Sequence, residues 1–220
     1  MSQEKERPIL FSAPMVRAIL EGRKTVTRRE VKKQAALDCL AAGFEPAFLA
    51  LPGNADLCPY GQTGDRLWVR ETWYCDHFEV MRGPYLKPDD LEVGEAIEDG
   101  TLVYAADGLA PYEQEQPTWK PSIHMPRWAS RILLEITDVR VERLQDITEE
   151  QALAEGIVGV PFRPDDGWPI CTGCMVGPDD GKTGLQTTAA KAFAGLWHSV
   201  GGNWNANPWV WVVEFKRVTP

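Results

Sequence analysis

A short basic segment holds the residue types that most directly suggest chemistry. Lys24 precedes Thr27 by three residues, and three arginines flank the pair: Arg23, Arg28 and Arg29. A threonine hydroxyl becomes a nucleophile when a base removes its proton, and neighbouring cations lower the pKa of a lysine toward that role. Residues three apart on a regular strand point to opposite faces, so catalysis requires a bend in the chain. The segment predicts either an anion-binding turn or a nucleophile with its activating base.

Glu155 is a second unusual placement, at the end of a short helix expected from Thr148 to Gly156. The negative end of a helix dipole disfavours a carboxylate, and lysine or arginine is more usual there. The alternative interpretation is an exposed glutamate that costs a few tenths of a kcal/mol. Glu155 is therefore a candidate functional carboxylate beside this simpler possibility.

The elements that would position these residues are short. Ser12 can cap a helix that Gly22 ends, and the β-branched residues after it indicate a strand. Thr148 and Gln151 have the spacing of a capping box, and Gly156 ends that helix. We also expect strands over residues 64–71, 131–141 and 209–215, and a helix over residues 188–199. Short elements without a βαβ rhythm predict an α+β fold with a small curled sheet or barrel.

The charge of the chain is unevenly distributed. Its 220 residues include 23 lysines and arginines and 32 aspartates and glutamates, so the formal charge is −9. A net negative protein is repelled by phosphate at long range. Between Arg17 and Lys33, however, seven basic residues accompany two acidic ones, a local charge of +5. Either this is an ordinary solvated face, or it binds a small ligand or a short single strand rather than an extended duplex.

The sequence predicts a cytoplasmic protein without a membrane span. No apolar stretch approaches the roughly 18 to 20 residues that a span requires. The first ten residues lack the apolar centre of a secretory signal. Five irregularly spaced cysteines fit a reducing compartment better than a disulfide framework.

We expect no cofactor and no metal. Cys171 and Cys174 have the spacing of half a zinc site, which leaves zinc as an alternative. The other candidate ligands do not form a second pair: Cys58, Cys75, His77 and His124. The chain contains none of the glycine-rich, phosphate-binding, metalloprotease or hydrolase-elbow motifs.

Two stretches rich in proline, glycine and acidic residues interrupt the scaffold, at about 76–121 and 158–186. Loops of this length inside a compact domain are usually functional or mobile. We expect a single domain over residues 1–220 with these two long loop insertions.

Three motifs in this order resemble the ASCH family (activating signal cointegrator homology), especially its larger members carried by bacteriophages and prophages. They are SAPMVRAILEGRKTVTRR at 12–29, GDRLWVRE at 64–71 and LQDITEEQALAEGI at 144–157. The resemblance covers the scaffold and not the two insertions. It implies a PUA-like fold, a small β-barrel flanked by short helices, and a role in binding RNA or modified nucleosides.

One small bacterial branch of this family, similar to this chain at its active residues, hydrolyses N4-acetylcytidine to cytidine and acetate. The resemblance implies that Lys24 activates Thr27 as the nucleophile, and that Glu155 serves as an acid or orienting group. Arg28 or Arg29 would then stabilise the oxyanion or bind phosphate. It thus implies an amidohydrolase that acts on a modified cytidine.

Other ASCH branches are linked to RNA binding, and nuclease activity has been attributed to some, so the fold does not fix the chemistry. The alternatives are a non-catalytic module for RNA or modified bases, a ribonuclease, or a protein-interaction role of the acidic insertions. Substrate-binding candidates are Arg23, Arg28, Arg29, Glu71 and Trp73, of which Trp73 would stack on a base. For Glu71 the alternative is a carboxylate paired with a nearby arginine.

Overall fold

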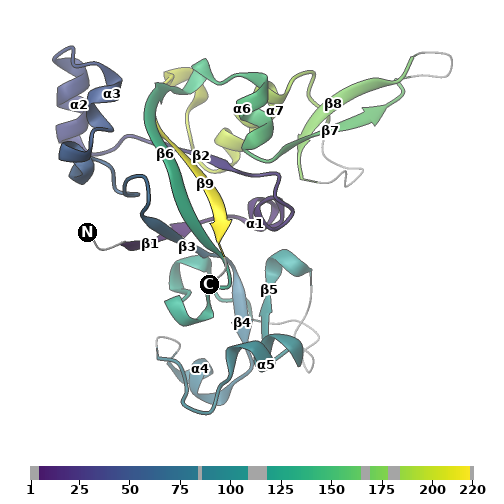
Figure 1. Cartoon of the computed structure of the whole chain (residues 1–220). Coiled ribbons are helices and arrows are strands. Elements are labelled where there is room, and N and C mark those ends of the chain that lie inside the picture. The colour runs from purple at the N-terminus through teal and green to yellow at the C-terminus, as the bar shows by residue number, and fades with distance from the viewer. Residues whose placement is uncertain (1–4, 84–85, 109–117, 165–168, 178–183, 219–220) are drawn as a thin grey trace. The chain divides into compact units, whose positions relative to one another are not determined.

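The protein is described here from a computed structural model (Figure 1), which describes residues 5–83, 86–108, 118–164, 169–177 and 184–218. The chain divides into two compact units, and each combines segments that are distant in sequence. Unit 1 comprises residues 1–17, 65–135 and 217–220, and unit 2 comprises residues 18–64 and 136–216.

Unit 1 is built on three strands in the order β1-β3-β6. β1 (Glu6–Leu10) runs parallel to β3 (Arg66–Arg70), which runs antiparallel to the first residues of β6 (Leu133–Arg143). The register places Trp68 opposite Leu133. The strands expected at 64–71 and 131–141 are therefore confirmed.

Regular elements as well as loops lie within the first expected insertion, and others flank it directly, all in unit 1. Strands β4 (Trp73–Cys75) and β5 (Leu102–Tyr104) pair in antiparallel fashion. The helical elements are α4 (Phe78–Arg82), α5 (Val93–Glu98), η2 (Ala105–Asp107), η3 (Ser122–His124) and η4 (Arg127–Ala129). They enclose a core of Trp73, Cys75, Val80, Leu91, Ala96, Leu102, Tyr104, Met125 and Ala129. Elements of three to six residues are too short for hydrophobic periodicity to indicate them.

In unit 2 the strand order is β6-β9-β2. β2 (Val26–Glu30) runs antiparallel to β9 (Trp209–Val218), with Thr27 opposite Val213. Because β2 is the last strand in this order, one of its edges is not covered by another described strand. This edge carries the candidate site.

Two helices pack against this sheet. α6 (Glu149–Ala154) and α7 (Ala189–Ser199) enclose a buried core with the strands. Its members are Val26, Leu144, Ile147, Ala152, Ile157, Cys174, Ala189, Ala192, Phe193, Trp197, Val210 and Val212. The helix expected at 188–199 is confirmed, with Thr188 accepting a hydrogen bond from the Lys191 backbone N–H at its start.

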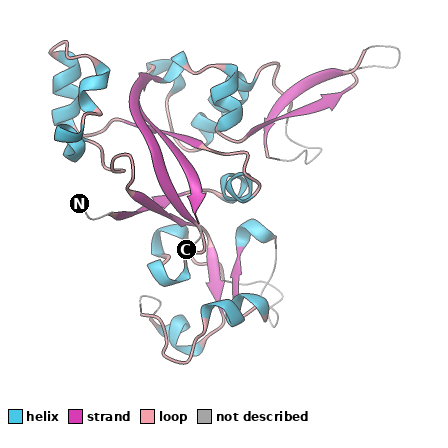
Figure 2. Ribbon diagram, viewed as in Figure 1, coloured by secondary structure: helices cyan, strands magenta, loops and turns pink. Residues whose placement is uncertain are grey.

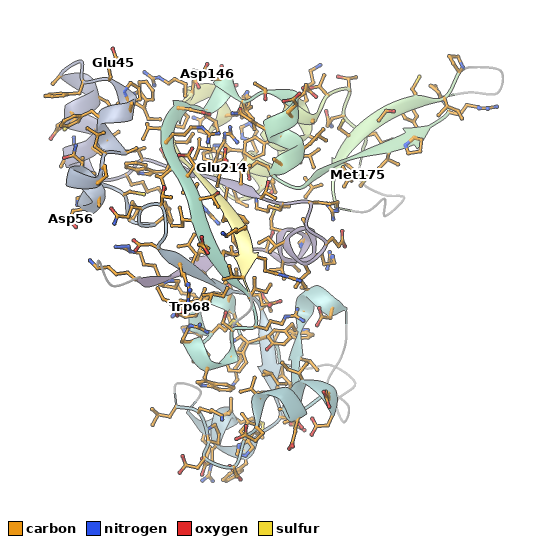
Figure 3. The ribbon with its side chains drawn as sticks, in the orientation of Figure 1. Glu45, Asp56, Trp68, Asp146, Met175 and Glu214 are labelled. Atoms are coloured by element: carbon orange, nitrogen blue, oxygen red, sulfur yellow. The ribbon has the colours of Figure 1, made fainter. Side chains whose placement is uncertain are left out.

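Figure 2 colours the helices and strands of the chain, among them the remaining elements of unit 2. They are α2 (Gln34–Ala41), α3 (Pro46–Leu49), η1 (Pro52–Leu57), η5 (Leu144–Asp146), η6 (Trp204–Ala206), β7 (Ile157–Phe162) and β8 (Cys171–Val176). β7 and β8 form an antiparallel hairpin within the second expected insertion, which therefore contains strands as well as loops. Figure 3 labels Met175 on β8 and Glu214 on β9.

The α+β class is confirmed, with a core that is mostly sheet and a few short helices. Among the described strands no closed barrel forms. Within the described residues, no helix combines the length and the apolar character that crossing a membrane requires.

α1 (Ala13–Leu20) follows Ser12, whose carbonyl accepts the Val16 N–H at 2.9 Å. Two glycines with positive φ then shape the approach to the site. Gly22, directly after α1, has φ +75° and open space where a Cβ would lie. Gly156, directly after Glu155, has φ +99°, and a Cβ there would lie 3.0 Å from Ala18 Cβ.

These two glycines predict different costs for the same substitution. Gly22→Ala should lower the free energy of unfolding by about 1 kcal/mol, because only the left-handed backbone is strained. Gly156→Ala should lower it by about 2 to 3 kcal/mol, since the new methyl group also meets Ala18. Urea unfolding of both variants measures the difference, and equal losses would show that Gly156 is required by its backbone alone.

Candidate functional site

Backbone hydrogen bonds place Lys24 beside Glu155. The Lys24 N–H donates to the Ala18 carbonyl, 3.0 Å away, and so follows the end of α1. The Thr25 N–H donates to the Ala154 carbonyl at 2.9 Å. Lys24 and Glu155 also form an isolated antiparallel bridge. The turn after α1 is thereby fixed against the carboxyl end of α6.

The position of Glu155 is set by both ends of α6. At the start, Thr148 Oγ1 accepts the Gln151 N–H at 3.2 Å and Gln151 Oε1 accepts the Thr148 N–H at 3.0 Å. This is the expected capping box. Glu155 follows the last helical residue, and the left-handed Gly156 turns the chain into β7.

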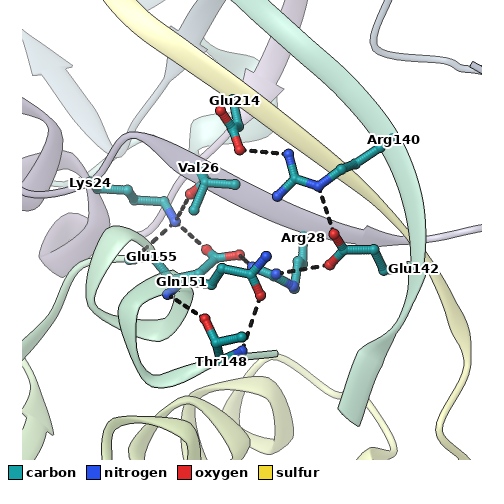
Figure 4. A network of polar contacts seen from close by, with 9 residues as sticks. All are labelled: Lys24, Val26, Arg28, Arg140, Glu142, Thr148, Gln151, Glu155 and Glu214. Atoms are coloured by element: carbon teal, nitrogen blue, oxygen red, sulfur yellow. Dashed lines mark hydrogen bonds and ion pairs between the residues drawn. The ribbon is translucent and has the colours of Figure 1, made fainter. Parts of the chain in front are cut away.

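The Lys24 ammonium group binds Glu155 directly (Figure 4). Lys24 Nζ lies 2.5 Å from Glu155 Oε2, 2.9 Å from the Glu155 carbonyl oxygen and 2.7 Å from the Val26 carbonyl oxygen. Three acceptors match the three N–H donors of an ammonium group. The exposed fractions of the two side chains are only 2% and 3%. The cation also lies at the carbonyl end of α6, which compensates for the carboxylate that the helix dipole disfavours.

Burial lowers the pKa of Lys24 from its ordinary value of 10.5, because the charged form loses its hydration. The charge of Glu155 and its hydrogen bond oppose this effect, and the charges of Arg29 and Arg28 add to it. Lys24 therefore gives up its proton more readily than an exposed lysine does.

Arg28 completes the shell around Glu155. Its Nη1 lies 3.4 Å from Glu155 Oε1, and its Nη2 lies 3.2 Å from Glu142 Oε2 on β6. The Arg28 side chain has no exposed surface. A phosphate contact by Arg28 would therefore require these two ion pairs to open.

Thr27 and Arg29 belong to the opposite face of β2. Side chains alternate along a strand, so Thr27 and Arg29 share one face, whereas Val26 and Arg28 share the other. Thr27 is buried, with 3% of its surface exposed. Val26 is paired with Glu214 between two hydrogen-bonded positions, so its carbonyl points away from β9. Lys24 Nζ, which binds that carbonyl, therefore lies beside the uncovered edge of β2.

The charge of the basic segment is partly neutralised by its own neighbours. Arg23 lies 2.5 Å from Glu21 and donates to the Gly156 carbonyl at 3.1 Å. Arg29 is half-buried, and burial lowers its pKa, while the charges of Tyr60 and Glu155 raise it. Because side chains alternate along β2, Arg29 is the arginine of this strand that shares a face with Thr27.

Glu71 has its own partner in unit 1. The Arg131 guanidinium donates to both Glu71 oxygens at 3.0 and 3.1 Å and to both Asp107 oxygens at 2.8 and 2.7 Å. It also stacks over the Tyr104 ring, 3.9 Å from the centroid. Burial raises the pKa of Glu71, although the Arg131 contacts oppose this. The alternative interpretation of Glu71, a carboxylate paired with an arginine, describes this arrangement.

Trp73 is a core residue of unit 1. Its ring is completely buried and meets Trp128 edge to face, with centroids 5.8 Å apart. Lys120 Nζ lies 5.3 Å from its ring centre. The structure thus brings together Lys24, Arg28 and Glu155 in unit 2, whereas Glu71 and Trp73 belong to unit 1.

The two cysteines of the CxxC sequence lie on a regular strand, β8. Residues three apart on a strand point to opposite faces, so Cys171 and Cys174 do not converge on one metal ion. In the part of the chain that the structure describes, no group of three or more histidine, cysteine, aspartate or glutamate side chains could hold a metal ion.

Comparison with known proteins gives no relative: no protein-family model, no curated protein and no solved structure matches the chain.

Sequence reasoning missed Glu142 and Arg140, which extend the cluster along β6. Asp138, Arg140 and Glu142 alternate with Val139 and Val141, so the three charged side chains share one strand face. This alternation was available in the sequence. It did not identify Arg28 as the buried cation that Glu142 binds, because Arg28 lies more than a hundred residues earlier in the chain.

The lowered pKa of Lys24 predicts a specific dependence of stability on pH. Between the folded pKa and 10.5 the unfolded chain binds more protons than the folded chain, so the free energy of unfolding rises with pH. Lys24→Met removes this contribution and breaks a buried ion pair, at a cost of about 3 kcal/mol near neutral pH. The stability advantage of the wild type should grow from pH 7 to pH 10 in urea unfolding. Lys32→Met, at an exposed lysine, should show no such trend, and a constant advantage at Lys24 would contradict the lowered pKa.

Proposed function

We propose that this protein is a PUA-like ASCH protein that binds a modified cytidine and hydrolyses its N4-acyl amide. The observation that carries the proposal is the buried contact between Lys24 Nζ and Glu155 Oε2, which joins positions 131 residues apart. The motif resemblance assigns both residues to the same reaction. Of the seven buried polar or charged residues among the described part of the chain, five are predicted site residues: Lys24, Thr27, Arg28, Glu71 and Glu155.

In the proposed mechanism, Lys24 accepts the proton of the Thr27 hydroxyl as the oxygen attacks the acyl carbon. The resting ammonium group donates to three acceptors, so Lys24 must first lose a proton and turn from the Val26 carbonyl toward Thr27. Its lowered pKa favours this step. Lys24 then gives this proton to the N4 amine as cytidine leaves, directly or through Glu155, which is hydrogen-bonded to it. Water hydrolyses the acyl-threonine ester, releasing acetate and restoring the hydroxyl.

Arg29 is the better candidate for the oxyanion or for a phosphate. It shares the face of Thr27, whereas the Arg28 guanidinium lies on the other face and is occupied by two glutamates. The two arginines, which sequence alone left as equal alternatives, thus receive different proposed roles. Arg28 fixes the carboxylate, and Arg29 contacts the ligand.

A second candidate function is recognition without hydrolysis, as in an RNA or modified-base binding module. It is favoured by the position of Thr27 on the face of β2 opposite to Arg28, which binds Glu155. In this case affinity for cytidine or a short RNA strand would fall in Arg29→Ala, decrease with salt, and be indifferent to Thr27→Ala.

Incubation of the purified protein with N4-acetylcytidine tests the hydrolytic function. Cytidine and acetate should form, as followed by chromatography, because Thr27 supplies the nucleophile. Thr27→Ala should reduce the rate at least a hundredfold. Thr25→Ala is the matched control, because Thr25 is exposed and two residues away in the same segment, and it should leave the rate unchanged.

No turnover by the folded wild type, or equal turnover in Thr27→Ala, would reject hydrolysis by this mechanism. Binding of cytidine that depends on Arg29 in the same samples would then support the second candidate.

A further inference from the structure

A continuous series of ion pairs joins the buried Lys24 to the surface of unit 2 (Figure 4). Beyond Arg28, Glu142 binds a different arginine through each of its two oxygens. Its Oε2 lies 3.2 Å from Arg28 Nη2, and its Oε1 lies 2.6 Å from Arg140 Nε. Arg140 Nη1 in turn lies 2.9 Å from Asp138 and 2.5 Å from Glu214 on β9. The Arg28 side chain has no exposed surface, whereas the Arg140 side chain is 28% exposed. The series therefore reaches the surface at Arg140.

The four inner members of this series balance one another in charge. Lys24 and Arg28 carry two positive charges, and Glu155 and Glu142 carry two negative ones. Without Glu142, the buried Arg28 would be left with Glu155 alone, which it already shares with Lys24. Charges are weakly screened in such an interior, so a change at Glu142 is felt at Lys24.

We propose that Glu142 is a positioning residue, which holds Arg28 against one oxygen of Glu155 and leaves the other to Lys24. Arg140 orients Glu142 for this task by binding its second oxygen. The inference rests on the proposed function only for the role of Lys24 as the base that accepts the Thr27 proton. The arrangement of the charges is independent of the substrate.

Charged groups from four elements packed around Lys24 enter this arrangement or act on its charge. They are Glu155 after α6, Arg28 and Arg29 on β2, Asp138, Arg140 and Glu142 on β6, and Glu214 on β9. Arg23 lies on the other side of Lys24 in sequence and pairs with Glu21.

Two substitutions should shift the titration of Lys24 in opposite directions. Glu142→Gln removes a negative charge and lets Arg28 compete for Glu155, so Lys24 should lose its proton at lower pH. Arg140→Gln removes a positive charge and leaves Glu142 entirely to Arg28, so Lys24 should lose its proton at higher pH. Loosening of the structure alone would not produce shifts of opposite sign.

Lysine labelled with ¹³C at Cε allows the titration to be followed by NMR in the intact chain, with the Lys24 resonance assigned through the backbone. Glu150→Gln and Arg143→Gln are the matched controls. They remove an exposed carboxylate on α6 and a cation at the end of β6, and neither belongs to the series. Both should leave the Lys24 midpoint in place.

Shifts of the same sign, or no shift, in the two test variants would overturn the proposal. If Glu142→Gln does not fold, Glu142→Asp shortens the same carboxylate and should give a smaller shift to lower pH. If the wild type hydrolyses N4-acetylcytidine, the acidic limb of kcat/KM should move with the NMR midpoint in each variant. If it hydrolyses nothing, the proposed function fails while the titration still decides the role of Glu142.

Discussion

The structure of unit 2 depends on how two buried charges are accommodated. A lone ammonium or carboxylate group is costly to remove from water, so Lys24 and Glu155 can be buried only together. Their pairing requires the turn after α1, the edge of β2 and the end of α6 to meet within one hydrogen-bond length. Backbone contacts from Lys24 to Ala18 and from Thr25 to Ala154 supply this alignment. Burial of this ion pair therefore requires the three elements to meet at one point, which is also the candidate site.

The side chains on the two faces of β2 have different surroundings. Val26 and Arg28 lie on the face that joins the core and the ion-pair series, and Arg28 has no surface left for a ligand. Thr27 and Arg29 lie on the opposite face, beyond that series. Under the proposed function, Arg28 would serve the fold of this segment, whereas Thr27 and Arg29 would serve the ligand. In the proposed mechanism, the ammonium group and the hydroxyl would approach each other around the edge of the strand, where Lys24 Nζ binds the Val26 carbonyl.

Local signals in the sequence predicted the local structure well. The capping box of Thr148 and Gln151 and the glycines that end α1 and α6 are present as expected, because these motifs depend on neighbouring residues alone. The elements within the first expected insertion were missed, since a strand of three residues and a helix of five carry no usable periodicity. The six-residue strands β7 and β8 were missed because both contain glycine and β7 also contains proline, and these residue types are depleted in strands.

At the site, the unusual position of Glu155 at the end of α6 correctly indicated that this carboxylate has a special environment. The charge pattern did not identify Lys24 as its partner. The series through Glu142 and Arg140 was also missed. Which cation meets which carboxylate depends on contacts between β2, β6 and α6, and no single segment contains that information.

The fixed length of α6 has a consequence for how this sequence can vary. Thr148 sets the first turn, and Glu155 follows the last, so the angle at which the carboxylate leaves the helix is determined by the number of residues between them. One inserted or deleted residue would rotate Glu155 by about 100° around the helix axis and turn it away from the β2 edge. Substitutions on the exposed face of α6 preserve this angle, whereas a change of length does not. In diverging copies of this chain, the spacing from Thr148 to Glu155 should therefore change less readily than the identities of the residues between them.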